Sequence, residues 1–290
     1  MKVFIFGQYW KKEDQAYISL LLEKLERENI NYKIYEPFAQ QVPDKISLSY
    51  CLSSHSELKE YAPDYIITLG GDGTILSAIT LIQDLETPIM GINLGRLGFL
   101  ASIEQERIET AIDKLKGGEY GISSRSMILL DAEPKLFNKK NFALNDLTIL
   151  KRDNSSMIVI HTFVDDVFLN SYWADGLIVS TPTGSTGYSL SCGGPIVFPE
   201  AQNFILTPVA PHNLNVRPIM ISNKHEISFK IEGRTDNFLC TLDSRHSIIT
   251  DEHKIKVRRN SFETKLIVLE GDNFMKTIRN KLNWGLDKRN

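Results

Sequence analysis

Short apolar runs alternate with longer amphipathic segments along the first hundred residues. One such segment, 14–30, carries Ile18, Leu21 and Leu25 on a single helical stripe. Parallel strands need long crossover connections, so strands separated by helices indicate a parallel α/β sheet. We predict a Rossmann-like α/β domain over residues 1–100. Its strands are expected at 3–6, 32–35, 65–69 and 88–94.

A helix is predicted at 104–116, and the pattern changes after it. From 120 to about 269 the chain consists mostly of short β runs joined by turns, among them 265–268. Such a density of short strands favours a sandwich or barrel. A final segment, 271–290, regains helical spacing and is expected to pack back on the first domain. The predicted fold class is α/β plus all-β, with an N-terminal Rossmann-like α/β domain and a second, β-sandwich-like domain over 101–270.

The charge balance and the cysteines exclude several classes of function. The 290 residues include 33 Lys and Arg against 36 Asp and Glu, a formal net charge of −3. This weak acidity argues against a nucleic-acid or membrane partner, and no stretch approaches the ~18–20 apolar residues of a membrane span. Cys51, Cys192 and Cys240 are odd in number and widely spaced, which indicates reduced thiols in a cytoplasmic protein rather than disulfides or a zinc site.

A glycine-rich break at 70–73 (Gly-Gly-Asp-Gly) follows the predicted strand at 65–69. Open α/β sheets bind ligands at the carboxyl ends of their strands, and glycines let a phosphate approach the backbone closely. The break matches neither the GxGxxG nor the Walker pattern. Its carboxylate, Asp72, is the candidate catalytic residue, as acceptor of a proton from a substrate hydroxyl or as an indirect metal ligand. The alternative is that Asp72 only caps the helix expected from Thr74.

A second segment, 175–191, is rich in hydroxyl groups. The strand-like run Leu177–Val179 leads into seven Ser or Thr side chains between Ser180 and Ser191. Hydroxyls and free backbone amides suit a polar, multidentate ligand such as a nucleotide sugar. The segment contains no Lys or Arg, which argues against an electrostatic phosphate clamp. The alternative is a flexible Ser/Thr linker.

Asn145 and Asp146 stand directly before another predicted strand. A side-chain amide beside a carboxylate can hold a ribose diol, because the amide donates and the acid accepts hydrogen bonds. The same pair also forms turns frequently, so the pattern by itself leaves both interpretations open.

Together these segments resemble the NAD kinase family over most of the chain, from Tyr65 to Trp284. The glycine-rich turn alone is shared with diacylglycerol and sphingosine kinases and, loosely, with phosphofructokinases. The segment 175–191 is far more specific. The matching segments are 70–74, 93–99, 145–146, 175–191 and 208–218.

The resemblance implies transfer of the γ-phosphoryl group of ATP to the 2′-hydroxyl of the adenosine ribose of NAD, which gives NADP. It also implies a divalent metal, normally Mg²⁺, that accompanies ATP, with unknown protein ligands. A homodimer or homotetramer is implied, in which the second domain of a neighbour completes the site. The family's catalytic acid falls on Asp72. Its substrate contacts fall on Gly73, Phe99, Asn145, Asp146, Asp175, Thr186, Gly187, Tyr188, Ser189, Leu190, Ser191 and Ala210.

Two positions depart from the residues that are usual in the family. Asp146 stands where the family more often has glutamate, and the shorter acid can accept the same hydrogen bonds if the backbone shifts. Gly187 stands where alanine is more common. The missing methyl group is expected to loosen the pocket without removing a polar group.

Two alternative functions share parts of this pattern. A lipid kinase of the diacylglycerol or sphingosine type has the same turn but needs an apolar acceptor cleft or a membrane-facing surface, which the hydroxyl-rich segment does not favour. A non-catalytic NAD(P) sensor would use the same pocket. A sensor has no need of a carboxylate near phosphate, so Asp72 favours an enzyme.

Overall fold

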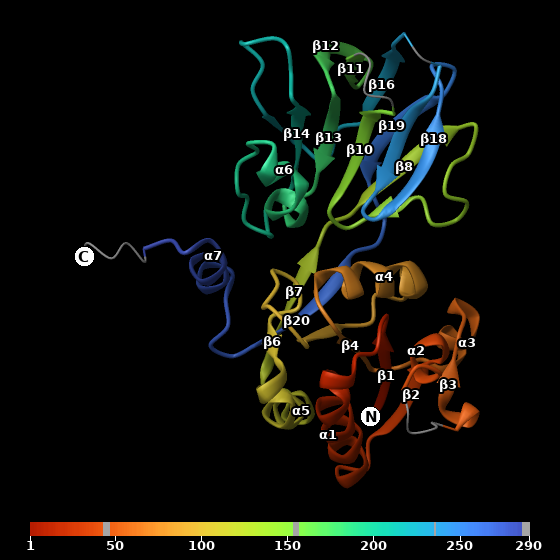
Figure 1. Cartoon of the computed structure of the whole chain (residues 1–290), viewed down its shortest axis with the longest axis vertical. Coiled ribbons are helices and arrows are strands. Elements are labelled where there is room, and N and C mark those ends of the chain that lie inside the picture. Colours follow the sequence, from red (N-terminus) through yellow and green to blue (C-terminus); the bar gives the residue numbers. More distant parts are fainter. Residues whose placement is uncertain (43–46, 153–156, 235, 286–290) are drawn as a thin grey trace. The chain divides into compact units, whose positions relative to one another are not determined.

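The computed structural model describes residues 1–42, 47–152, 157–234 and 236–285. The chain forms two compact units (Figure 1). The first comprises Met1–Ser124 together with the chain from Thr264 onward, and the second comprises Arg125–Glu263. Each unit is built around its own cluster of buried apolar side chains.

An eight-stranded sheet forms the centre of the first unit. Its strand order is β3-β2-β1-β4-β5-β20-β7, with β6 paired to β5, and the pairs from β3 to β20 are parallel. The central strands β1 and β5 are almost entirely buried, as expected of strands that are covered on both faces. The strands are β1 (Lys2–Gly7), β2 (Asn31–Tyr35), β3 (Cys51–Leu52), β4 (Tyr65–Leu69), β5 (Ile89–Asn93), β6 (Ile103–Glu104), β7 (Tyr120–Arg125) and β20 (Thr264–Leu269).

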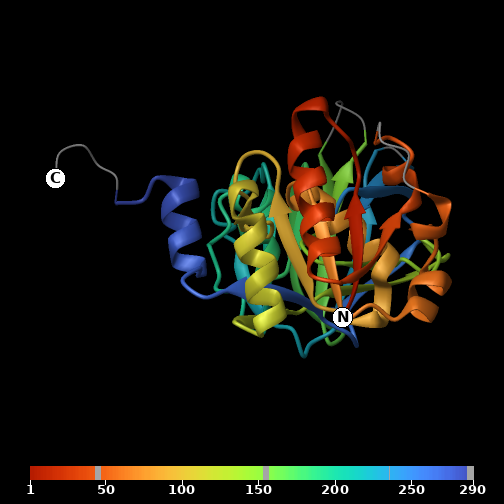
Figure 2. The same cartoon turned by 90° about the horizontal axis from the view of Figure 1, so that it is seen from below.

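Helices connect these strands. The predicted stripe of Ile18, Leu21 and Leu25 is the buried face of the first helix, which packs beside α5 (Figure 2). The α-helices of this unit are α1 (Gln15–Arg27), α2 (Glu36–Ala39), α3 (His55–Tyr61), α4 (Asp72–Ile82), α5 (Ile108–Gly117) and α7 (Phe274–Leu282). Short 3-10 helices lie at Lys12–Asp14, Leu48–Tyr50, Gln83–Leu85 and Gln105–Arg107. Within the described part of the chain, no helix is both long and apolar enough to cross a bilayer.

The division between the units differs from the predicted boundary near residue 100. Residues 101–124 belong to the first unit, because β6 pairs with β5 and the buried face of α5 joins the same core. The run 265–268, predicted as part of the β-rich domain, lies in β20 and pairs with β5 in the parallel sheet. Strand periodicity does not reveal which sheet a strand joins, since the pairing partner is distant in sequence.

The C-terminal helix predicted within 271–290 is α7, and it belongs to the first unit. Asn273 caps it by accepting a hydrogen bond from the backbone N–H of Lys276 at 2.9 Å. Ile278 is buried, and the ring of Phe274 lies 6.4 Å from the ring of Phe99, centroid to centroid. The last predicted residues, 286–290, lie outside the described part of the chain.

Two antiparallel six-stranded sheets form the second unit. Their orders are β15-β14-β13-β10-β17-β18 and β12-β11-β16-β19-β8-β9. Side chains from both sheets share one buried cluster, which makes this unit a sandwich. The strands are β8 (Ile128–Glu133), β9 (Phe142–Ala143), β10 (Asp146–Lys151), β11 (Ile158–Val164), β12 (Val167–Ala174), β13 (Gly176–Ser180), β14 (Asn203–Val209), β15 (Ile219–Ser222), β16 (Ile227–Glu232), β17 (Phe238–Leu242), β18 (Arg245–Ile249) and β19 (Lys254–Arg259).

Candidate active site

A cavity of about 260 Å³ opens at the carboxyl ends of three neighbouring strands of the first unit. The segments that follow β1, β4 and β5 line it, so it lies where open α/β sheets bind ligands. Two cationic residues, Lys11 and Arg96, share the cavity with the glycine-rich turn. Cations beside exposed backbone amides suit a phosphate group. The lining residues are Tyr9, Lys11, Asp14, Leu69, Gly70, Gly71, Thr74, Asn93, Leu94, Gly95 and Arg96.

The buried side chain of Asn93 shapes the turn after β5. Its Oδ1 accepts a hydrogen bond from the backbone N–H of Gly95 at 2.7 Å, and its Nδ2 donates to the carbonyl of Arg96 at 2.8 Å. On the other side of the cavity, burial raises the pKa of Asp14, and the charge of Lys11 opposes that rise. One wall is therefore held by an amide and the other carries an acid that is partly desolvated.

The predicted catalytic residue, Asp72, is the first residue of α4 and does not occupy the N-cap position, which is Gly71. Instead Oδ2 accepts a hydrogen bond from the backbone N–H of Phe99 at 2.8 Å. Oδ1 accepts from the N–H groups of Leu100 at 3.0 Å and Ala101 at 2.9 Å. The alternative in which Asp72 only caps the helix is therefore wrong. These bonds fix Phe99, a predicted substrate contact, beside Asp72, and Oδ2 keeps a lone pair for a further donor.

Glycine is required at Gly98 because of this contact. A Cβ atom at that position would lie 1.8 Å from Asp72 Oδ1. Gly70 has a φ of +143°, and a Cβ there would meet Thr74 Oγ1 at 2.3 Å. At Gly71 and Gly73, by contrast, an added Cβ would meet nothing within 4 Å in the described structure apart from chain neighbours. Packing within the protein does not require glycine at these two positions, so their open backbone is available to a ligand.

The second unit brings together Asn145, Asp146 and Gly187. Asp146 begins β10 and pairs with Ser180 at the end of β13, so the strand register places it beside the loop that follows. A Cβ at Gly187 would lie 3.9 Å from Asn145 Nδ2 and from Asp146 Oδ2. Burial, with a contribution from the charge of Asp243, raises the pKa of Asp146 to about 7.

The hydroxyl-rich segment is an ordered element and not a flexible linker. It forms a 3-10 helix at Thr183–Thr186 and the short helix α6 at Tyr188–Ser191. Thr181 Oγ1 donates to the carbonyl of Leu144 at 2.6 Å, and Ser185 Oγ accepts from the backbone N–H of Val197 at 3.0 Å. The buried hydroxyls of this segment therefore hold the loop in place.

The predicted contacts in this loop differ in accessibility. Ser189 is fully buried, and its Oγ lies 2.8 Å from Thr207 Oγ1, so its hydroxyl already has a partner inside the protein. Tyr188 and Ser191 are exposed, whereas the others are half-buried. The half-buried contacts are Thr186, Gly187 and Leu190.

Asp175 and Ala210 lie toward the other end of β13. The strand begins at Gly176, which pairs with Leu150 and Val209, whereas its last residue pairs with Asp146. The carboxylate of Asp175 forms an ion pair with Lys151 at 2.7 Å. The predicted residues of the second unit thus form two groups, one around Asp146 and one around Asp175.

Several residues of these sites were not predicted. Lys11 belongs to no motif, and Arg96 lies in the family-matching segment 93–99 but was not named as a site residue. Both reach the cavity because the carboxyl ends of β1 and β5 are neighbours of β4. Lys151 was also missed, as was Asp243, an acid with a buried side chain in the turn between β17 and β18. An acid at a tight turn between two apolar strands was the available sequence signal for Asp243.

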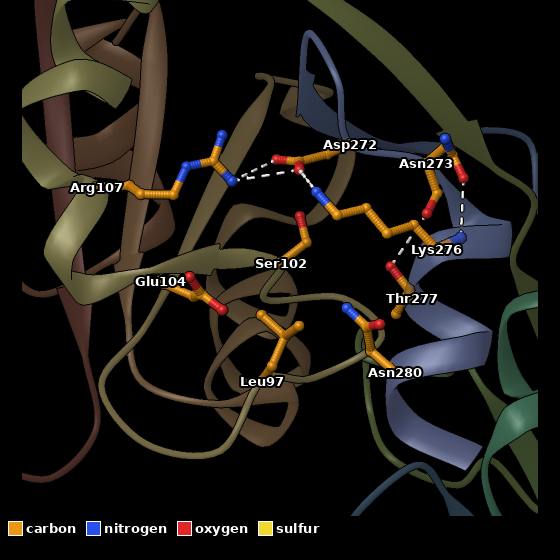
Figure 3. A pocket seen from close by; sticks show the side chains of 9 residues that line it. All are labelled: Leu97, Ser102, Glu104, Arg107, Asp272, Asn273, Lys276, Thr277 and Asn280. Atoms are coloured by element: carbon orange, nitrogen blue, oxygen red, sulfur yellow. Dashed lines mark hydrogen bonds and ion pairs between the residues drawn. The ribbon is translucent and has the colours of Figure 1, made fainter. Parts of the chain in front are cut away.

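A smaller cavity of about 60 Å³ lies beside α7 (Figure 3). Arg107 donates to both oxygens of Asp272, at 2.9 and 3.2 Å, and Lys276 reaches the same carboxylate at 3.3 Å. The two cationic residues that line this cavity, Arg107 and Lys276, are therefore already paired with an acid. None of the predicted site residues lines this cavity, which is too small for a nucleotide.

Metal-binding side chains do not cluster in the part of the chain that the structure describes. There, no group of three or more His, Cys, Asp or Glu residues is placed to hold an ion. A metal that arrives with a substrate would have to take most of its ligands from that substrate.

The parallel sheet with its phosphate-suited turn, and the sandwich with its amide–acid pair, define a nucleotide-binding α/β protein with an added β domain. Family comparison agrees with this class. The ATP-NAD kinase N-terminal domain matches residues 17–120, and the ATP-NAD kinase C-terminal domain matches residues 144–269. The chain belongs to the NAD kinase family, as its motifs predicted, and is therefore a kinase of the phosphotransferase class.

Relatives match over the full chain. The sequence is 48% identical over 288 residues to the NAD kinase of Cytophaga hutchinsonii, covering 99% of both chains. It is 37% identical over 289 residues to the NAD kinase of Bacteroides fragilis, covering 100% of both. Neither a lipid kinase nor a non-catalytic sensor is supported by these relatives.

Solved structures share the fold. A yeast NADH kinase complexed with NADH superposes with a TM-score of 0.84 at 21% identity, covering 99% of this chain and 89% of that one. An NAD kinase from Archaeoglobus fulgidus in complex with ATP gives a TM-score of 0.77 at 24% identity, covering 98% and 99%. The predicted combination of an α/β domain and a β-sandwich-like domain is confirmed.

Proposed function

We propose that this protein transfers the γ-phosphoryl group of ATP to the 2′-hydroxyl of the adenosine ribose of NAD, forming NADP and ADP. Membership of the NAD kinase family over the full chain supports the reaction. The observation that carries the proposal is the setting of Asp72. Its carboxylate is oriented by backbone donors and belongs to the glycine-rich turn. Gly70, Gly71 and Thr74 of this turn line the cavity with Lys11 and Arg96, and Asp72 itself lies beside the lining residues in sequence.

Asp72 is the general base in this proposal. A ribose hydroxyl is a weak nucleophile at neutral pH, and a carboxylate within ~2.6–3.2 Å can accept its proton as the new oxygen–phosphorus bond forms. The bond between the γ-phosphorus and the β–γ bridging oxygen breaks at the same time, and ADP leaves. The backbone donors at 99–101 fix the direction of the carboxylate, which leaves Oδ2 as the proton acceptor.

The remaining residues bind and align the substrates. Lys11, Arg96 and the backbone amides of the glycine-rich turn are suited to the phosphates of ATP. A divalent metal, normally Mg²⁺, would accompany ATP and neutralise phosphate charge. In the second unit, the amide of Asn145 and the carboxylate of Asp146 are suited to a ribose diol of NAD.

We also infer a cytoplasmic homodimer or homotetramer with no nucleic-acid or membrane partner. The described cysteines are free thiols, which fits a reducing compartment. The assembly is what the resemblance to the NAD kinase family implies, with the second domain of a neighbour completing the site. Light scattering coupled to size-exclusion chromatography measures the assembly, and a monomer at working concentration would contradict it.

The test is a coupled assay. Purified protein is incubated with ATP, Mg²⁺ and NAD, and NADP is measured with an NADP-specific dehydrogenase. Parallel reactions replace NAD by NADH or by a lipid alcohol, or add a chelator. NADP formation that depends on ATP and metal is expected. Phosphorylation of the lipid alcohol alone would establish a lipid kinase, and NAD binding without turnover would establish a sensor.

A further inference from the structure

A buried carboxylate lies directly behind the predicted NAD-binding pair. Asp243 occupies the turn between β17 and β18, and its side chain is only 5% exposed. Its Oδ1 accepts hydrogen bonds from the backbone N–H groups of Asn145 at 2.8 Å and Asp146 at 3.3 Å. Its Oδ2 accepts from the N–H of Leu144 at 3.0 Å.

The backbone of Asp243 strengthens the same connection. Its own N–H donates to the carbonyl of Asp146 at 3.0 Å, which extends the pairing of β17 with β10 by one step. The residue has a φ of +52°, a left-handed conformation that aspartate tolerates better than most residues. Both the main chain and the side chain of Asp243 are therefore directed at residues 144–146.

Backbone amides, more than a cation, compensate the buried acid. Burying a carboxylate is costly unless it is hydrogen-bonded or paired. The guanidinium of Arg245 is 4.0 Å from Asp243 Oδ2, and it donates instead to the carbonyl groups of Lys140 and Phe142. A neutral residue could form this turn without the desolvation cost of a buried carboxylate. The presence of an acid therefore indicates that its oxygens are needed to accept the three N–H groups of 144–146.

The opposite side of Asn145 is held as well. Its carbonyl accepts a hydrogen bond from the backbone N–H of Thr181 at 2.9 Å. A Cβ at Gly184 would lie 2.1 Å from the same carbonyl oxygen, so the loop packs directly on this peptide. The main chain of this segment is therefore fixed on both sides, and its side-chain groups, the Asn145 amide and the Asp146 carboxyl, are the parts that can adjust to a ligand.

We propose that Asp243 is a positioning residue for NAD. By holding the backbone of 144–146, it orients the Asn145 amide and the Asp146 carboxyl for a ribose diol. The arrangement parallels the first unit, where Asp72 accepts three backbone N–H groups from 99–101. The inference rests on the proposed function, and it adds a residue that touches no substrate itself.

The test is Asp243→Asn. Asparagine has nearly the same shape, but its Nδ2 would turn a donor toward a backbone N–H. We expect the KM for NAD to rise about 10-fold or more while the KM for ATP stays within about twofold, because one charge-assisted bond is lost and a buried donor is left unsatisfied. Isothermal titration with NAD alone should show the same loss of affinity.

Cys240→Ala is the matched control. Cys240 is fully buried in β17, on the same hairpin, and pairs with Ile149, away from 144–146. Truncating it lowers the thermal midpoint by removing core volume and leaves the KM for NAD unchanged. If Asp243 serves stability alone, Asp243→Asn will behave like Cys240→Ala, and that result overturns the proposal.

The outcomes separate this inference from the proposed function. Wild-type protein that forms no NADP refutes the function, whereas active wild-type protein with an unchanged KM in Asp243→Asn refutes only the positioning role. If Asp243→Asn does not fold, amide hydrogen exchange on the wild-type protein tests the positioning role instead. Protection of the Leu144 and Asn145 amides without NAD supports the proposal, and exchange at the rate of an open loop overturns it.

Discussion

Asp72 and Asp146 are residues of one type in two different environments. Backbone donors from 99–101 orient the first carboxylate, and one of its oxygens keeps a free lone pair. The second lies buried beside Asp243. Desolvation and a neighbouring negative charge both disfavour the ionised form, so the pKa of Asp146 rises to about 7. Hydrogen bonds therefore set the orientation of the Asp72 carboxylate, whereas burial and a neighbouring charge set the protonation state of Asp146.

Asp72→Asn is expected to fold and bind NAD but to lose about 10²–10⁴-fold in kcat, because an amide cannot accept the ribose proton. Single-turnover NADP formation measures the loss. Gly98→Ala keeps the carboxylate but forces it away from the loop, since the new Cβ would lie 1.8 Å from Oδ1. Near-wild-type turnover of purified Asp72→Asn would remove the general-base role.

Protonation of Asp146 is expected to weaken NAD binding below about pH 7, where its pKa lies. An acid with a raised pKa is neutral below that pH and then no longer accepts through both oxygens. We expect kcat/KM for NAD to fall by up to about tenfold per pH unit on the acid side. The kcat/KM of Asp146→Asn for NAD should be low at every pH and should not decline further on the acid side. A flat wild-type profile down to about pH 5.5 would contradict the assignment.

At the scale of elements, the two predicted binding segments were found because their signals are local. A glycine-rich break after an apolar run and a hydroxyl-rich stretch between apolar flanks both fall within about ten to fifteen residues of sequence. What the loop 181–191 does with its hydroxyls was not visible, because several bond to residues such as Leu144 and Thr207 that are remote in the chain.

Two glycines of this loop are expected to respond differently to alanine. Gly184→Ala places a Cβ 2.1 Å from the carbonyl of Asn145, so it should lower stability by about 1–3 kcal/mol and impair NAD binding. Gly187→Ala meets Gly184 O at 3.2 Å, a tight contact but a far milder one, and its φ is negative, so it should lower stability less than Gly184→Ala does. Its KM for NAD is expected to be no higher than that of the wild type. Thermal melting and NAD titration give the comparison, and equal melting of both variants would contradict it.

At the scale of the whole molecule, the chain contains one continuous and one discontinuous unit. Residues 125–263 include both sheets of the sandwich and their shared core. The first unit needs the returning strand β20, which lies between β5 and β7 and buries Leu266, Ile267 and Leu269. The spacing of apolar residues does not show that a strand pairs with one far earlier in the chain. For this reason the predicted boundary fell near residue 100.

The excised segment 125–263 is therefore expected to fold cooperatively, whereas 1–124 alone is not. Without β20 the parallel sheet loses a central pairing and exposes apolar side chains. Circular dichroism during thermal melting distinguishes the two fragments, and mixing 1–124 with a 264–290 peptide offers a rescue. A sharp melting transition of 1–124 by itself would show that β20 is dispensable.

The amino-acid sequence alone determined the class of each unit, the glycine-rich turn with Asp72, the hydroxyl-rich loop and the family. These properties follow from the order and spacing of neighbouring residues, which is what a linear chain displays. Only the tertiary structure decided that β20 completes the first sheet and that Lys11 and Arg96 share a cavity. It alone showed that Asp72 and Asp243 hold distant backbone segments. Each of these depends on contacts between residues far apart in sequence, and such contacts exist only once strand order and register bring the partners together.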